Sequence, residues 1–236
     1  MKHLPALAHG ELDELFDNIW FVQGTVKMPM LMPMKISRSM TVLRNPGNSE
    51  LTIVNSMRLN EQGLAKLEKL GKVAHVIRIA GFHGRDDGFY RDKYGATVYA
   101  LKGQIYTRKL DGGQSVQVPY MQPDQWLDDA GALPIPDARL KLFRTSNPPE
   151  GMLMLHRNGG ILITGDALQN TPEPDAYVNF PARLMMRKMG FFKPCNVGPG
   201  WLQFAKPDTA EVRSILNLDF EHVLPAHGAP VIGNAK

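Results

Sequence analysis

The sequence has a single cysteine and no long hydrophobic run. Cys195 has no second cysteine with which to form an internal disulfide, so no oxidative framework holds this fold. No stretch approaches the roughly 18 uncharged apolar residues of a transmembrane helix. Near the N-terminus, Glu11, Asp13 and Glu14 precede any apolar run, which is not the pattern of a secretory signal. We therefore expect a cytoplasmic protein.

The sequence also has little excess of positive over negative charge. The 27 Lys and Arg residues exceed the 23 Asp and Glu residues by only four. A basic cluster lies within residues 183–193, but the chain has no Lys/Arg run of the kind that binds nucleic acid. We expect partners that are neither nucleic acids nor membranes.

What the sequence does contain is typical of one folded α/β domain. Of its 236 residues 43% are hydrophobic and 21% are charged, which is enough to bury a sizeable core. No Pro- or Ser-rich linker separates the two halves of the chain. We therefore predict a single domain over residues 1–236, preceded by a tail over residues 1–15, in which two similar β-rich halves carry outer helices.

Local patterns predict most of the elements. Short apolar runs predict strands at residues 19–22, 40–44, 51–55, 73–79 and 97–100, and later at 140–144, 152–155, 161–164 and 223–225. Asn60 is a typical helix N-cap and Gly71 a typical C-cap, so a helix is predicted between them. Further helices are predicted over residues 89–94 and after Thr209.

Polar side chains that bind divalent metals follow three of the predicted strands. The first group is His83, Asp86 and Asp87, and the others are Asp166 and His227. Imidazole and carboxylate groups are ligands for zinc, iron and manganese. In α/β proteins such residues gather at the carboxyl ends of strands. The order of the three groups therefore predicts one metal site.

In this order the chain resembles the metallo-β-lactamase superfamily from about residue 16 to residue 231. The likeness rests on the strand at residues 18–24, on Lys93 to Ala100, on Thr164-Gly165-Asp166-Ala167-Leu168, and on Leu224-Pro225-Ala226-His227-Gly228. The resemblance implies an αββα sandwich of two mixed sheets with outer helices. It also implies a metal site at one edge between the sheets.

The chain departs from the family in its metal loop, so the resemblance is to a divergent member with an incomplete motif. Residues 81–87 read Gly-Phe-His-Gly-Arg-Asp-Asp where the family has His-x-His-x-Asp-His. Without a gap, His83 takes the place of the second histidine; with one inserted residue, Asp86-Asp87 stand for Asp-His. Near Thr145 to Pro149, where the family has a further histidine, there is none.

The surviving donors imply a mononuclear site rather than the dinuclear zinc centre of the family. Its metal ligands are expected among His83, Asp86, Asp87, Asp166 and His227. This carboxylate-rich set favours one divalent ion, manganese or iron before zinc. Whichever of Asp86 and Asp87 does not bind the ion is expected to act as the catalytic proton acceptor.

Two methionine-rich segments predict an apolar substrate pocket. Met28, Met30, Met32 and Met34 alternate, so an extended backbone points all four to one side. In the resembling family this segment overhangs the site; a copper(I) site is the alternative. Met185 and Phe191 belong to a second such patch, which could also form a homodimer contact. We assign Met30, Met32, Met34, Met185 and Phe191 to the pocket.

Two functions follow from these residues. The first is a metal-dependent hydrolase that uses metal-activated water on a small ester, thioester or lactone with an apolar portion. The alternative is a non-catalytic binding or interaction protein that kept the fold and lost the metal site. It would contain no metal cofactor.

Overall fold

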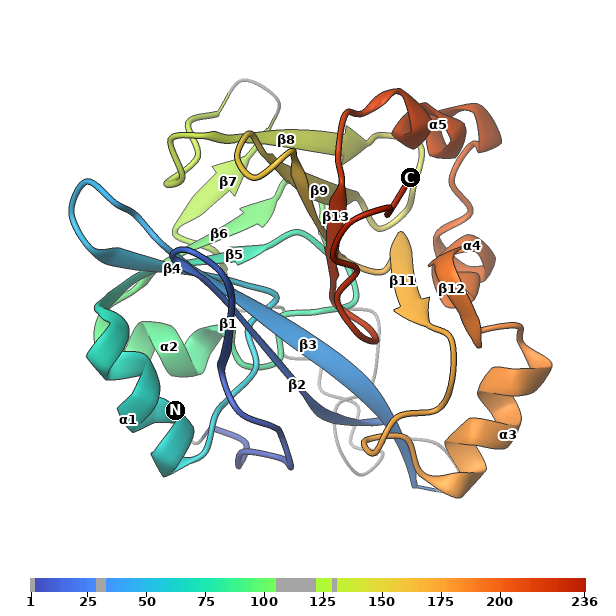
Figure 1. The fold of residues 1–236 in the computed structure, drawn as a ribbon, viewed down its shortest axis with the longest axis horizontal. Helices are drawn as coiled ribbons and strands as arrows, with labels where there is room; N and C mark the ends of the chain where they lie inside the picture. The colour runs from blue at the N-terminus through green and yellow to red at the C-terminus, as the bar shows by residue number, and fades with distance from the viewer. Residues whose placement is uncertain (1–2, 29–32, 105–121, 129–130) are drawn as a thin grey trace.

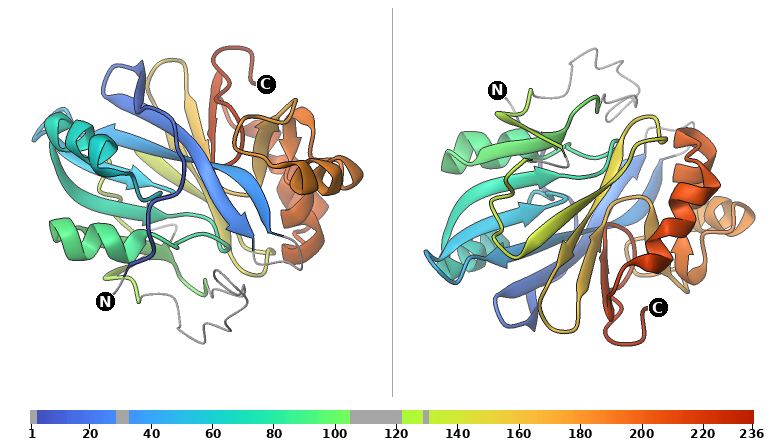
Figure 2. Two further views of the ribbon diagram at one scale, coloured as in Figure 1. Left: turned by 90° about the horizontal axis from the view of Figure 1, so that it is seen from below. Right: turned by 90° about the horizontal axis from the view of Figure 1, so that it is seen from above.

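Two β-sheets pack face to face, and helices cover the outer face of each (Figures 1 and 2). This computed structural model describes residues 3–28, 33–104, 122–128 and 131–236. The predicted αββα sandwich is confirmed. Within the described ranges, no helix is long and apolar enough to cross a membrane.

The larger sheet is built from the N-terminal half of the chain. Its strands follow one another in sequence order: β1 (Asp13–Phe16), β2 (Ile19–Met28), β3 (Met34–Arg44), β4 (Glu50–Val54), β5 (Lys72–Arg78), β6 (Thr97–Leu101) and β7 (Gln125–Leu127). The strands from β1 to β4 pair antiparallel, and those from β4 to β7 pair parallel. Helices α1 (Glu61–Leu70) and α2 (Asp87–Tyr94) make the crossovers on either side of β5.

The smaller sheet is built from the C-terminal half, in the order β13-β10-β9-β8. Its strands are β8 (Ala138–Phe143), β9 (Glu150–Leu155), β10 (Ile161–Thr164) and β13 (His222–Pro225). A separate ribbon joins β11 (Leu168–Thr171) to β12 (Lys193–Val197). The helices of this half are α3 (Phe180–Lys188), α4 (Pro199–Ala205), α5 (Thr209–Arg213) and the 3-10 helix η1 (Ser214–Asn217).

Alternating side chains divide the core into layers. In β2, Ile19 and Phe21 face the smaller sheet, whereas Trp20 and Val22 face α1 and α2. In β10, Ile163 belongs to the core between the sheets and Leu162 packs toward α4. Period-two alternation places successive side chains on opposite faces of a sheet. Strands such as β2 and β10 therefore supply two apolar layers, which explains their hydrophobic runs.

The predicted elements are present, and several are longer than predicted. The side chain of Asn60 caps α1 by accepting a hydrogen bond from the Gly63 N–H at 2.8 Å. β2 and β3 continue past the predicted ends to the pair Met28–Met34, because the hairpin remains hydrogen-bonded there. The last predicted helix begins at Thr209 but is capped by Asp208.

The segment ahead of β1 differs from the predicted N-terminal tail. Gly10 N–H donates to the Gln23 carbonyl, and Thr25 N–H donates to the Ala8 carbonyl, both at 2.8 Å. Leu12 is buried in the outer core, and β1 already begins at Asp13. From residue 8 onward this segment therefore lies along β2, because its backbone groups find partners there.

Candidate metal centre

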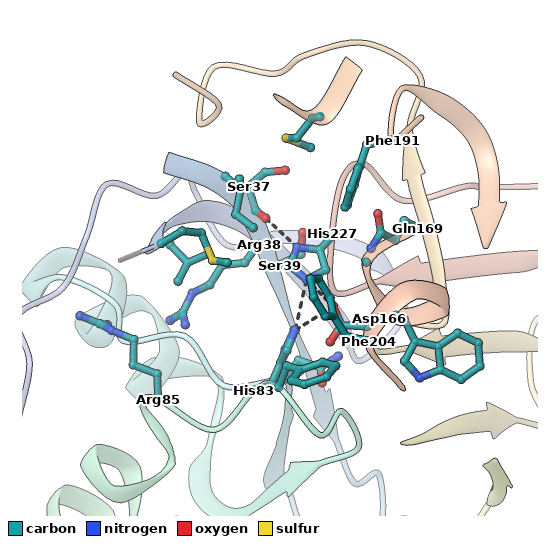
Figure 3. A pocket seen from close by; sticks show the side chains of 18 of the residues that line it. Ser37, Arg38, Ser39, His83, Arg85, Asp166, Gln169, Phe191, Phe204 and His227 are labelled. Carbon is teal, nitrogen blue, oxygen red and sulfur yellow. Dashed lines mark hydrogen bonds and ion pairs between the residues drawn. The ribbon is translucent and has the colours of Figure 1, made fainter. Parts of the chain in front are cut away.

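Three side chains from three distant parts of the chain converge at one end of the sandwich. Nε2 of His83 lies 3.1 Å from Nε2 of His227 and 3.5 Å from Oδ1 of Asp166. Nε2 of His227 lies 3.0 Å from the same Asp166 oxygen. Figure 3 shows the three groups pointing toward one another. Of the five metal ligands predicted from the sequence, His83, Asp166 and His227 therefore lie together.

Strand register explains the convergence. β10 and β13 pair in parallel with Thr164 opposite Pro225, and the next residues but one are Asp166 and His227. Parallel strands end at the same sheet edge, so these two side chains emerge side by side. His83 reaches them from the loop that follows β5 in the facing sheet.

A backbone contact fixes the orientation of His227. Its Nδ1 lies 2.7 Å from the Ser37 carbonyl oxygen, to which an Nδ1–H donates. In the neutral imidazole the proton is then on Nδ1 and the Nε2 lone pair points at the cluster. This is how proteins commonly hold a histidine that binds a metal.

The three donor atoms fit a single ion. Ligand atoms about 2.0–2.2 Å from one ion are about 3.0–3.5 Å from each other at tetrahedral or octahedral angles. The separations of 3.0, 3.1 and 3.5 Å fall in this range. Oδ2 of Asp166 is also buried and has no hydrogen-bond partner among the described residues. A cation between these atoms would satisfy all of them.

Electrostatics favour the metal-binding protonation states of His83 and Asp166. Burial lowers the pKa of His83, and the nearby Asp166 charge only partly offsets burial. Burial raises the pKa of Asp166, but His83 and His227 outweigh it and hold that pKa well below its usual range. At neutral pH His83 is therefore neutral and Asp166 ionised, as metal ligands must be.

Asp86 lies outside the cluster, which corrects its prediction as a metal ligand and as a catalytic residue. Its carboxylate is buried and accepts hydrogen bonds from the guanidinium groups of Arg38 and Arg85 and from the Arg58 N–H. Burial raises the pKa of Asp86, but the two arginine charges outweigh burial and lower it. Asp86 is thus already committed to internal cations.

Asp87 is likewise committed and is corrected for the same reason. Its Oδ1 accepts a hydrogen bond from the Ser56 hydroxyl at 2.6 Å. Its Oδ2 lies 3.3 Å from Nη1 of Arg78, and both side chains of this ion pair are 1% exposed. As the first residue of α2, Asp87 links this helix to the ends of β4 and β5. We assign it a structural role.

Glu150 is a buried carboxyl beside the cluster that the sequence analysis missed. It is 1% exposed, and the backbone N–H groups of Gly81, Asp166 and Ala167 donate to it. Burial raises the pKa of Glu150 well above its usual value, and the Asp166 charge adds to this effect. A Cβ on Gly165 would lie 2.6 Å from Oε1 of Glu150, so this close approach requires the glycine of the Gly-Asp motif.

Glu150→Gln is expected to make metal-free protein more stable than the parent at pH 8. Because the folded-state pKa is raised, the stability contributed by Glu150 is present below about pH 4.3 and is lost as the pH rises. Glutamine keeps the shape and the acceptor oxygen without the charge. Urea unfolding at pH 5 and 8 should show the advantage shrinking at pH 5. The exposed control Glu173→Gln should show no such trend, and an equal trend in both variants contradicts this account.

The cluster opens onto a cavity of about 840 Å³ with one apolar side. The apolar lining includes Met185, Met186, Met189, Phe191, Trp201 and Phe204. Met185 and Phe191 thus lie where the pocket was predicted. Met34 instead packs against the small hydrophobic cluster at α3, which Met185 and Phe191 also contact. Met30 and Met32 lie outside the described residues, so their assignment and the copper alternative stay predictions.

Solved structures of metallo-β-lactamases resemble this chain over almost its whole length. DIM-1 metallo-β-lactamase exposed to ceftazidime has a TM-score of 0.60 at 13% identity, covering 98% of this chain and 93% of that one. VMB-1 at pH 5.5 has a TM-score of 0.61 at 12% identity, covering 97% and 93%. FIM-1 from Pseudomonas aeruginosa, in its mono-zinc form, has a TM-score of 0.58 at 8% identity, covering 96% and 90%.

Sequence comparison adds no closer relative. No family profile matches the chain, and no curated protein matches it. At identities this low, structural likeness shows the fold alone. The chain therefore has the metallo-β-lactamase fold, as the resemblance implied, and its described residues include the cluster of His83, Asp166 and His227.

Proposed function

We propose that this protein is a metal-dependent hydrolase-like protein that binds one divalent ion through His83, Asp166 and His227. The observation that carries the proposal is the convergence of three donor atoms within 3.5 Å at the edge of a cavity. The fold adds support, because one similar structure, FIM-1, is described in a mono-zinc form.

The donor set in the structure no longer favours manganese or iron over zinc, as the sequence did. With Asp86 and Asp87 committed to arginines, two imidazoles and one carboxylate remain. Such a set suits zinc as well as iron or manganese. When bound, an ion of this type supplies a Lewis acid and lowers the pKa of its water toward neutrality.

The cavity determines which substrates fit this chemistry. Methionine and phenylalanine side chains on one side provide an apolar surface next to the cluster, with Phe191 and Phe204 near it in Figure 3. Flexible methionines adapt to ligands of different shape. We propose a small ester, thioester or lactone whose apolar portion packs against these side chains and displaces water from them.

The test combines metal analysis with a hydrolysis assay. Protein purified without chelators and offered zinc, iron or manganese is expected to hold close to one equivalent. It should then hydrolyse thioesters with medium-length acyl chains, lose this activity in chelator, and regain it with metal. Metal content far below one equivalent after every ion has been offered contradicts the proposal. So does hydrolysis that chelators do not change.

A further inference from the structure

The cavity has a cationic side as well as an apolar one. Of the charged side chains that line it within the described ranges, Lys27, Arg38 and Arg85 are cations, and Asp166 is an anion held by two histidines. Figure 3 shows the side chains of Arg38 and Arg85 on the same side of the His83–His227 cluster. A water-excluding wall strengthens the attraction of such cations for an anion.

Arg38 is the central group on this side. It lies on β3 and is only 8% exposed, and its Nη2 donates to Oδ2 of Asp86. Its Nε is buried without a hydrogen-bond partner among the described residues, although the side chain lines the cavity. A buried donor without a partner is unfavourable, so a ligand anion that hydrogen-bonded to this N–H would remove that cost.

Asp86 positions two guanidinium groups at once. Oδ2 of Asp86 accepts from Arg38, and its Oδ1 accepts from Nη1 of Arg85 at 2.9 Å. A single carboxylate thereby holds two planar cations beside the cavity. Guanidinium groups bind carboxylates and phosphates in preference to neutral groups, because their N–H donors match the spacing of the anion's oxygens.

We propose that the substrate is anionic and amphiphilic, with its carboxylate or phosphate bound by Arg38 beside Arg85 and its apolar chain on the Met185–Phe191 wall. The location rests on the proposed hydrolytic function, which places the reacting bond near His83, Asp166 and His227. A volume of about 840 Å³ accommodates a ligand of medium size rather than a polymer.

Binding to chelator-treated protein tests the proposal without any need for metal or turnover. The probes are octanoate and octyl phosphate, with neutral octanamide as the matched control, and the measurement is isothermal titration calorimetry. The parent is expected to bind at least one anion about tenfold or more tightly than octanamide. The anion that binds more tightly distinguishes a carboxylate substrate from a phosphate substrate.

Variants assign the preference to Arg38. Arg38→Gln removes this guanidinium while Asp86 keeps Arg85 as a partner, and it is expected to abolish most of the discrimination. Arg38→Lys keeps the charge but lacks Nε, so it should lose part of the discrimination and provides the answer if Arg38→Gln is unfolded. Lys69→Gln, on the exposed face of α1 and outside the cavity lining, is the control and should keep the preference.

Asp166→Asn separates this inference from the proposed function. The variant alters the metal cluster but is expected to retain the preference for anions, because Arg38 is intact. Equal affinity for octanamide and both anions in the parent overturns the inference. Full discrimination in the Arg38 variants, or its loss in Asp166→Asn, also overturns it. A protein that fails to bind metal but shows the expected pattern contradicts only the hydrolase proposal.

Discussion

Arg78→Met is expected to reduce the free energy of unfolding by about 3–5 kcal/mol. Arg78 and Asp87 are each 1% exposed, with Nη1 and Oδ2 3.3 Å apart. Methionine fills much of the arginine volume but leaves the Asp87 charge in the interior without this cation. Removing one partner of a buried ion pair is costly because the remaining charge is desolvated without compensation.

Two controls distinguish this effect from a general loss of packing. Arg78→Met combined with Asp87→Asn removes both charges, so urea unfolding should show a clear recovery of stability relative to the single variant. Arg157→Met breaks the more exposed pair with Asp137 and should cost about 1 kcal/mol or less. A double variant as unstable as Arg78→Met alone would show that the charge pair is not the cause.

Asp166→Asn is expected to weaken metal binding by at least about 100-fold. Changes to residues that merely support metal ligands commonly cost 10- to 100-fold in affinity, and Asp166 supplies the one carboxylate of the cluster. Asparagine has nearly the same shape but no charge. Equilibrium dialysis against zinc, followed by metal analysis, measures the loss. Added zinc should raise the melting temperature of the parent but not of this variant.

Asp86→Asn and the exposed Asp17→Asn complete this comparison. The structure predicts that both keep the metal stoichiometry of the parent, because neither carboxylate is in the cluster. Loss of metal in Asp86→Asn would instead support the ligand set predicted from the sequence. If Asp166→Asn changes neither metal content nor melting temperature, the alternative of a fold retained without a metal site gains support.

The strands and the first helix could be predicted because their signals are local. Apolar runs such as residues 161–164 are buried on both faces, and Asn60 caps a helix through its own side chain. The ribbon of β11 and β12 and the helix α3 were not predicted. The strand β12 has the sequence Lys-Pro-Cys-Asn-Val and is largely exposed, so it lacks an apolar pattern.

Prediction of the site was limited by contacts that are distant in sequence. His83, Asp166 and His227 were found because each follows a strand, and strand ends converge. Asp86 and Asp87 have the same local pattern, but the arginines that bind them decide their role. Arg38 is 48 residues from its partner Asp86 in the sequence, so no local sequence pattern predicts the pair.

Glu150 was missed for a related reason. It follows two prolines and begins β9, where a polar residue is typical of a strand end. Glu150 is buried because the segments around Gly81 and Asp166 face it, and it accepts hydrogen bonds from their backbone N–H groups. A search for lone carboxylates at the start of fully apolar strands would have found it.

A crystal soaked in zinc, with data collected at the zinc absorption edge, tests the metal centre most directly. We expect an anomalous peak about 2.0–2.2 Å from Nε2 of His83, Nε2 of His227 and an oxygen of Asp166. The same experiment on Asp166→Asn should give no peak there. A parent map with no peak within reach of these three atoms, or with zinc bound only elsewhere on the protein, would contradict the account.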